Sequence, residues 1–248
     1  MRISRIMAAV AATATLGLVV ASGTANAAGA EPAAADPPQV LQTVEGIDVS
    51  HHQGVIVWAT VALSKRFAYI KATEGTNFLD PMFDLNYAQA TVVGMIRGGY
   101  HFARPAMSDG AAQADYFIDN GGGWTPDGRT LPGALDLEGN CSGKTPAQMV
   151  QWIRQFTDRY QARTGREAVI YTNRDWWNNC TGGSAAFAAT NPLWHAEPDS
   201  SPQVPNGWSR YTFWQYNWEG SVLGIVGDVD LDVFNGSQQQ LDTFVNVA

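Results

Sequence analysis

From about residue 44 onward, short runs of β-branched and aromatic residues alternate with stretches long enough to form helices. Such alternation predicts an α/β fold with a parallel sheet covered by helices. The eight runs expected to be strands are 46–49, 68–71, 95–102, 133–137, 168–172, 192–196, 211–216 and 229–233. At this length we favour a single α/β barrel over a doubly wound sheet. The last three runs leave too little room for full helices between them, so the barrel should be irregular at its end.

Helix signals separate several of these runs. Asp80 and Pro81 supply a cap and a proline at the first helical position, and Gly94 follows the expected helix. Asp109 is expected to cap a second helix that runs to the glycines at 121–123. These helices would connect consecutive strands of a parallel sheet.

The clearest helix is expected over residues 146–164. Thr145 and Gln148 can form a capping box around its start, and Gly165 stands where a left-handed C-terminal residue belongs. A broad apolar stripe marks the face turned to the core. The stripe consists of Met149, Val150, Trp152, Ile153, Phe156 and Tyr160.

The first 27 residues have the features of a secretory signal peptide. Arg2 and Arg5 give a positively charged start, an apolar stretch follows over 6–20, and Ala25-Asn26-Ala27 is an A-x-A cleavage site. The stretch is short and rich in alanine, which argues against a permanent membrane span. We therefore expect cleavage near Ala27 and an extracellular, secreted protein.

The exported part is expected to be a flexible leader at 28–43, rich in Ala and Pro, and one domain at 44–248. The whole chain has 15 basic and 23 acidic residues, and the signal peptide holds two of the basic ones and no acid, so the exported part carries 13 − 23 = −10. This charge argues against nucleic acid, which needs a basic surface, and against capture by an anionic membrane. We expect a monomer that binds neither.

The two cysteines, Cys141 and Cys180, are expected to form a single disulfide in an exported protein. Without histidines at ligand spacing they make a poor zinc site. The bridge would close a loop of about 39 residues, which in the chain-entropy account contributes roughly 3–4 kcal/mol. It would also hold the loop that leaves the fourth predicted strand.

Polar and aromatic side chains gather at the ends of the predicted strands, where α/β barrels carry their functional residues. They are Asp48, Ser50, His51, His52 and Gln53; Lys71 and Glu74; Tyr100, His101 and Arg104; Asp136 and Glu138; Tyr171 and Asn173; Trp194; Gln215 and Tyr216; and Asp230 and Asp232. Acids on the first, fourth and eighth strands would meet around one mouth if the barrel closes.

The sharpest of these features is the pair Asp136 and Glu138, which a strand would turn to the same face. Two neighbouring carboxyls usually have their pKa values pushed apart, which suits one acid and one anion. Acidic pairs also occur on solvated strand faces, so the pair alone does not decide between the two interpretations.

The aromatic residues allow two interpretations as well. The chain has nine Trp and eight Tyr, and Trp194, Trp214 and Trp218 fall near the expected mouth. Flat aromatic faces pack well against sugar rings, but strand alternation could equally turn Trp194 or Trp214 into the core.

Other chemistries find little support in the sequence. His51 and His52 are adjacent on a segment expected to be extended, where their side chains would point apart, which argues against a metal site. The chain has no G-x-S-x-G elbow, no G-x-G-x-x-G and no Walker loop. We therefore expect no metal and no cofactor.

Taken in order, seven motifs of the chain resemble the glycoside hydrolase family 25 lysozymes of the Chalaropsis type. The motifs are GIDVSHHQG (46–54), IKATEG (70–75), GYHFARP (99–105), LDLE (135–138), IYTN (170–173), FWQY (213–216) and VDLDVFNG (229–236). The resemblance covers about residues 44–240. It implies an irregular TIM-like barrel of five β/α units followed by three β-strands. It also implies hydrolysis of the β-1,4 bond between N-acetylmuramic acid and N-acetylglucosamine in the glycan strands of peptidoglycan.

The resemblance also assigns roles to the acids. Glu138 would be the general acid that protonates the leaving oxygen, with Asp136, Asp48 and Asp230 as the further acidic positions of the catalytic site. Asp232 stands where the family often has Asn, so it ranks below Asp230.

The substrate-binding positions implied by the family are Tyr100, Tyr171 and Gln215, to which we add Trp194. One departure follows Trp194: His195 and Glu197 replace the more usual small, Tyr- or Arg-containing segment. These two residues could reshape the sugar site or the contact with the peptide stem, or be a harmless loop variant.

For the mechanism we favour attack by the substrate's own 2-acetamido oxygen, with Asp136 ionised and orienting the acetamido nitrogen, over direct attack by a protein carboxylate. The need for a protonated Glu138 predicts an acidic pH optimum. Two other functions remain open: a catalytically silent wall-binding module, and another glycosidase on a related barrel, such as a chitinase.

Overall fold

The computed structural model describes residues 43–198 and 201–246, so the expected signal peptide and leader lie outside the described residues. The described strands form one sheet of nine strands that closes on itself, because β1 pairs with β9 on one side and with β2 on the other. The strands are β1 (Val44–Val49), β2 (Phe67–Glu74), β3 (Phe78–Leu79), β4 (Ile96–Phe102), β5 (Ala134–Leu137), β6 (Val169–Thr172), β7 (Leu193–Ala196), β8 (Phe213–Gly220) and β9 (Val229–Phe234). The short β3 forms a hairpin on β2, and the other eight strands make the barrel.

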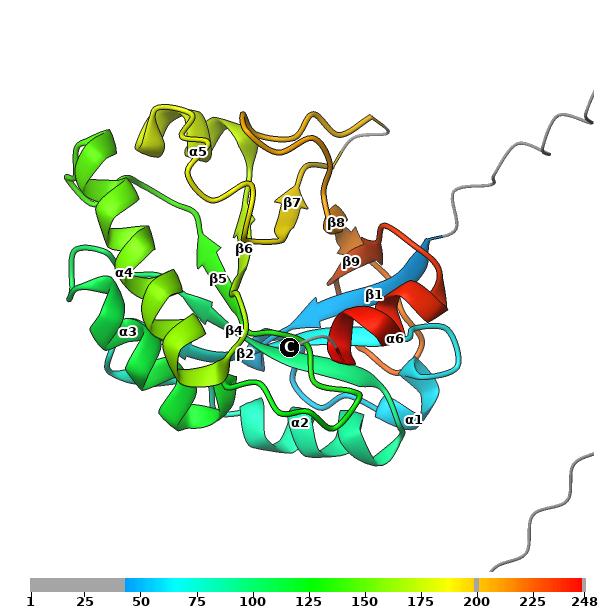
Figure 1. Cartoon of the computed structure of the whole chain (residues 1–248). Helices are drawn as coiled ribbons and strands as arrows, with labels where there is room; N and C mark the ends of the chain where they lie inside the picture. The colour runs from blue at the N-terminus through cyan, green and yellow to red at the C-terminus, as the bar shows by residue number, and fades with distance from the viewer. Residues whose placement is uncertain (1–42, 199–200, 247–248) are drawn as a thin grey trace, which may run out of the picture. The chain divides into compact units, whose positions relative to one another are not determined.

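A helix follows each of the first five barrel strands, and the two-residue strand β3 precedes the second of these helices. They are α1 (Trp58–Val61), α2 (Phe83–Val92), α3 (Gly110–Phe117), α4 (Pro146–Thr164) and α5 (Arg174–Thr181), and α6 (Gln238–Asn246) comes after β9. Figure 1 shows α2, α3 and α4 along the outside of the barrel. The predicted barrel of five β/α units followed by three strands is thus confirmed.

The strands around the barrel are parallel with one exception. Strand β9 runs antiparallel to both of its neighbours, β8 and β1. The start of β9 therefore lies at the same end of the barrel as the carboxyl ends of the other strands. This reversal places the acids at the start of β9 in the barrel mouth.

Inside the barrel, the side chains are apolar at one end and mostly polar at the end that carries the mouth. On β5, for example, Ala134 and Asp136 share the inner face because a strand alternates its side chains. The apolar end of the interior also needs glycine at position 46, because a Cβ there would lie 2.3 Å from the ring of Phe67. The apolar side chains inside the barrel form one cluster, which we call the interior cluster. Leu241 and Val245 of α6 are buried in it and cover the end of the barrel away from the mouth.

Outside the barrel, a second apolar cluster packs the strands against the helices. Helix α4 begins and ends as predicted: Thr145 and Gln148 form a capping box, and Gly165 takes the left-handed conformation with φ 74°. Its stripe faces this core, with Met149, Trp152, Ile153, Phe156 and Tyr160 buried and Val150 partly buried.

The predicted start of α2 is wrong. The helix begins at Phe83, and Asp80 does not cap it as expected. The carboxylate of Asp80 accepts hydrogen bonds from the backbone N–H groups of Met82 and His51 and contacts the His51 ring at 2.7 Å. Asp80 therefore holds the loop after β1, and this long-range contact outweighs its local capping preference.

The second predicted cap is confirmed: Asp109 accepts a hydrogen bond from the N–H of Ala112 and starts α3, which continues as a π-helical turn over Ile118–Gly122. None of the described helices combines the length and apolar character needed to cross a bilayer.

Candidate active site

A cavity of about 460 Å³ opens at the carboxyl ends of the parallel barrel strands. All eight residues predicted to be catalytic or substrate-binding line it. The full lining is Asp48, Ser50, His52, Lys71, Tyr100, Phe102, Asp136, Glu138, Tyr171, Asn173, Trp194, Ala196, Gln215, Trp218 and Asp230. We call this space the main cavity.

Three carboxyls from the two antiparallel strands β1 and β9 form one cluster. Asp48 lies opposite Asp230 in the register of the pair, and Asp232 is fully buried below them. Burial raises the pKa of all three carboxyls, and the neighbouring acids raise that of Asp48 further. The pKa reaches about 6 for Asp230 and about 8 for Asp232. The cluster thus retains protons at a pH where separate carboxyls would be ionised.

The side-chain amide of Gln215 links the carboxyl cluster to the aromatic side chains of Tyr171 and Trp218. Its Nε2 donates to Oδ2 of Asp48 at 2.6 Å. Its Oε1 accepts from the hydroxyl of Tyr171 at 2.8 Å and from the indole N–H of Trp218 at 2.9 Å. With both ends of the amide engaged, the orientation of Gln215 is fixed before any ligand binds.

Asp136 and Glu138 lie on the opposite wall, on β5 and directly after it. Asp136 is 6% exposed, and its Oδ1 is buried without a hydrogen-bond partner among the described residues. Burial first, and then the charge of Glu138, raise the pKa of Asp136 well above its ordinary value. The carboxyl as a whole lines the main cavity, so it offers acceptor capacity there to a ligand N–H or O–H.

Glu138 stands at the mouth, where the residue is solvent-exposed. Partial burial of its carboxyl raises its pKa, while the nearby Lys71 and Arg104 act in the opposite direction. Because Asp136 and Glu138 compete for protons across a short distance, the pair holds a proton more readily than an isolated carboxyl. The larger rise in pKa belongs to the buried Asp136, so in the unliganded protein the shared proton rests more readily on Asp136 than on Glu138, the reverse of the expected order.

Lys71 and Arg104, the two cations near Glu138, form an ion-pair group with Glu74. These residues were expected at strand ends, but no role was predicted for them. Glu74 pairs with Nζ of Lys71 at 2.7 Å and with Nε of Arg104 at 2.7 Å. Both cations also lie over the ring of Phe102, at 4.7 and 4.5 Å from its centroid. The ion pairs hold the positive charges of Lys71 and Arg104 near Glu138.

The structure separates the three tryptophans near the mouth. Trp194 is 1% exposed, stacks on Tyr69 with ring centroids 4.6 Å apart, and donates its indole N–H to Asp232. It forms the floor of the main cavity and belongs to the interior core at the same time. Trp218 is 52% exposed at the rim of the main cavity and offers an open aromatic face, although it was not among the predicted substrate-binding residues.

The departure at His195 and Glu197 lies outside the main cavity. His195 is fully buried on the face of β7 opposite to Trp194, and its Nε2 lies 2.9 Å from a Glu197 carboxylate oxygen. The backbone carbonyl of Glu197 accepts the indole N–H of Trp214 at 2.7 Å. These contacts brace the loop after β7, and neither side chain lines the main cavity.

The expected geometry of the histidine pair is wrong. Residues 51–53 form a 3-10 turn capped by Ser50, and the rings of His51 and His52 lie 4.1 Å apart rather than on opposite sides. His51 is engaged by Asp80, while His52 lines the main cavity. Within 43–198 and 201–246, no group of three or more His, Cys, Asp or Glu side chains is arranged to hold a metal ion.

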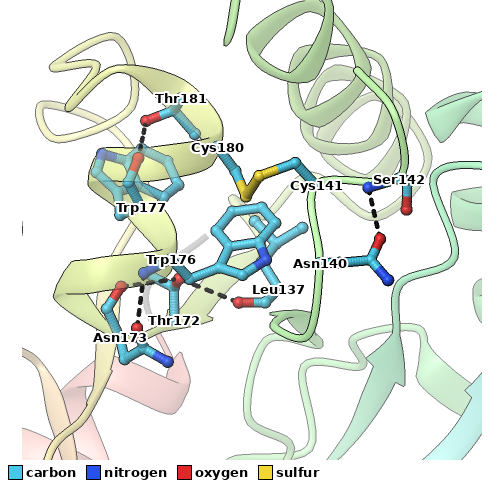
Figure 2. Close-up of a disulfide and its surroundings, with 10 residues drawn as sticks. All are labelled: Leu137, Asn140, Cys141, Ser142, Thr172, Asn173, Trp176, Trp177, Cys180 and Thr181. Carbon is cyan, nitrogen blue, oxygen red and sulfur yellow. Dashed lines mark hydrogen bonds between the residues drawn. A yellow bond between two sulfur atoms is a disulfide. The ribbon is translucent and has the colours of Figure 1, made fainter. Parts of the chain in front are cut away.

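The predicted disulfide between Cys141 and Cys180 is confirmed. It joins the loop after β5, which carries Glu138, to α5 (Figure 2). The hydroxyl of Thr172 on β6 donates to the backbone carbonyl of Leu137 at 3.0 Å, which also holds the end of β5. The proton-donor candidate therefore stands on a loop tied to two neighbouring elements.

Comparison with known proteins gives a consistent result. The profile described as glycosyl hydrolases family 25 matches residues 47–225. Lysozyme M1 of Streptomyces globisporus is 53% identical over 216 residues, covering 84% of this chain and 74% of the relative. N,O-diacetylmuramidase of Chalaropsis sp is 48% identical over 203 residues, covering 76% of this chain and 96% of the relative.

The fold is shared with solved structures. The bacterial lysozyme from Streptomyces coelicolor superposes with a TM-score of 0.81 at 53% identity, covering 82% of this chain and 97% of that chain. A family GH25 lysozyme from Aspergillus fumigatus gives a TM-score of 0.78 at 43% identity, covering 83% and 100%. The chain is a member of glycosyl hydrolases family 25.

Proposed function

We propose that this protein is a secreted muramidase that hydrolyses the β-1,4 bond between N-acetylmuramic acid and N-acetylglucosamine in peptidoglycan. The observation that carries the proposal is the pair Asp136 and Glu138 in an aromatic-lined cavity, one carboxyl buried and the other at the mouth. The names of the relatives, lysozyme and N,O-diacetylmuramidase, support the same substrate.

Glu138 acts as the general acid in this proposal. Its raised pKa keeps the proton available, and its place at the mouth suits contact with the oxygen that links two sugars. As the glycosidic bond breaks, the proton passes from the Glu138 carboxyl to the leaving oxygen. Glu138, then ionised, can take a proton from the water that completes hydrolysis.

Asp136 acts on the substrate's acetamido group. The carboxyl of Asp136, which lines the main cavity, can accept a hydrogen bond from the acetamido N–H, which turns the acetamido carbonyl oxygen toward the anomeric carbon. This oxygen forms the new bond as the leaving sugar departs, and water later opens the resulting ring. A hydrogen bond from the acetamido N–H favours the ionised form of Asp136 and so shifts the shared proton to Glu138 when substrate binds. A trapped ester between Asp136 and a sugar would overturn this route.

The decisive test is Glu138→Gln. We expect the variant to lose at least about 100-fold in the rate of clearing cell-wall suspensions, because the amide cannot supply the proton. Asp158→Asn, an exposed carboxyl on the outer helix α4, is the matched control and should keep full activity. Thermal unfolding should show both variants folded.

The same digestion distinguishes the alternatives. New reducing ends on muramic acid are expected for a muramidase, ends on glucosamine would indicate a different glycosidase, and no ends would indicate a binding module. The rate should fall as pH rises through the pKa of Glu138, so a rate still rising above about pH 8 would contradict its role as the acid.

A further inference from the structure

Two further hollows lie beyond Glu138, on the side away from the main cavity. The first, which we call the inner hollow, has a volume of about 470 Å³ and lies between residues 103–107 and the loop that begins at Glu138. Glu138 lines both spaces, so it stands between the main cavity and the inner hollow.

The second space, the outer hollow, has a volume of about 500 Å³ and lies between residues 105–109, residues 142–144 and the first turns of α4. It shares Pro105, Ala106, Met107 and Ser142 with the inner hollow, so the two adjoin. The three spaces therefore follow one another from the buried acids, past Glu138, to the outer surface of α4, and we call this series the path.

The direction of this path follows from the chemistry of the proposed reaction. A general acid stands between the sugar that reacts and the sugar that leaves. The acids that act on the reacting sugar all lie in the main cavity, so the leaving sugar lies on the other side of Glu138, in the inner hollow. The next sugar along the strand then reaches the outer hollow.

Peptidoglycan alternates its two sugars, and only the muramic acid units carry peptide stems. With the cut after a muramic acid, the first leaving unit is glucosamine without a stem, and the second is a muramic acid with one. The inner hollow is lined largely by small or apolar residues, with Arg104 its one cation, whereas the outer hollow presents amides, hydroxyls and Lys144. The order of the hollows thus matches the order of the units.

Lys144 is the cation of the outer hollow, and no carboxylate lies within salt-bridge distance of it in the part of the chain that the structure describes. The acid there, Asp109, is engaged at 2.7 Å by the N–H of Ala112 as the cap of α3. Gln151 is exposed on the same side of α4. Lys144 and Gln151 are therefore available to a ligand that carries carboxylates and amides.

The wall of both hollows is held in a defined conformation. Ser142, shared by the two hollows, has φ 52°, and it is the single residue other than glycine with positive φ among the described residues. The disulfide at Cys141 fixes its neighbour to α5. Strain of this kind persists where surrounding structure enforces it, so the loop offers a preformed surface rather than one that must order on binding.

We propose that the outer hollow binds the peptide stem of the second leaving unit, with Lys144 contacting a stem carboxylate and Gln151 a stem amide. This inference rests on the proposed muramidase activity. The stem site would make the enzyme favour strands whose stems are present.

The test compares two substrates: soluble glycan strands with their stems, and the same strands after an amidase has removed the stems. Lys144→Gln should lower kcat/KM on stem-bearing strands about three- to fivefold, the range expected for one solvent-accessible ion pair, and leave stem-free strands unaffected. Lys144→Arg should restore most of the loss. Gln151→Ala should show the same dependence on the stem with a smaller loss.

Arg129→Gln is the matched control, because it removes an exposed cation from the loop that precedes β5, at the opposite end of the barrel. It should leave both rates unchanged. An equal loss by Lys144→Gln on the two substrates, or no loss on either, would overturn the stem site while the muramidase assignment stands. Failure of the unmodified enzyme to release reducing ends from either substrate would overturn the muramidase assignment and the stem site together.

Discussion

Asp232 shows how one buried carboxyl ties the stability of this protein to pH. Its side chain is fully buried, one oxygen accepts the Trp194 indole N–H at 2.8 Å, and the other has no hydrogen-bond partner among the described residues. Burial raises its pKa from 3.8 to about 8. The native state therefore binds this proton more tightly than the unfolded chain does. Its contribution to stability is full below about pH 4 and is lost as pH rises toward 8.

Asp232→Asn should remove this dependence. The amide oxygen can still accept from Trp194, and its NH₂ group can donate to the Asp48 carboxyl, so position 232 carries no buried charge at any pH. We expect a higher Tm than that of the natural protein at pH 8, by about 2–4 °C for each kcal/mol gained, and little difference at pH 4. Thermal unfolding at the two pH values measures it, with the exposed Asp158→Asn as control. A variant that loses the same stability at both pH values would show that the carboxyl matters only for packing.

At the scale of elements, the disulfide joins two segments whose separation would move Glu138. Replacing both cysteines, Cys141→Ser with Cys180→Ser, should lower the free energy of unfolding by about 2–4 kcal/mol because the unfolded chain gains freedom. Urea unfolding measures the change. A reductant should bring the natural protein to the stability of the double variant and leave the variant itself unchanged. If the reductant has no effect on the natural protein, the bridge contributes nothing to its stability.

The helices also show which sequence signals are sufficient to predict a helix and its bounds. Helix α4 was predictable to the residue because its capping box, apolar stripe and C-terminal glycine agree with one another. Helix α5 was missed, although Asn173 caps it and Gly182 ends it in the left-handed conformation, because its eight residues are too few for a clear apolar period. The start of α2 was misplaced because the carboxylate of Asp80 is used by His51, a contact 29 residues away that no local pattern reveals.

At the scale of the whole molecule, the sequence predicted the site more completely than it predicted the path of the chain. The eight site residues were found from strand ends and family motifs, and all of them line one cavity. The reversal of β9 was not predicted, although it is what places Asp230 at the mouth from the start of its strand rather than from its end. Strand direction depends on which neighbours a strand meets, and residue types at its ends do not encode this. The extent of the hollows beyond Glu138 likewise depends on how two distant loops meet.

One end of the barrel is filled by apolar side chains, and the other end carries the main cavity. Whether the two ends act independently can be tested at α6. A capping pattern of Ser237 and Gln240 begins this helix, and its fully buried Leu241 packs into the interior cluster at the end away from the main cavity. Leu241→Ala should cost about 2–5 kcal/mol through lost contacts and the space left behind. The value of kcat on peptidoglycan at 25 °C should stay unchanged, because the carboxyls proposed to be catalytic lie at the opposite end. Urea unfolding and initial rates measure the two quantities, with the exposed Gln239→Ala on the same helix as control. A fall in kcat with full folding would show that the two ends of the barrel are coupled.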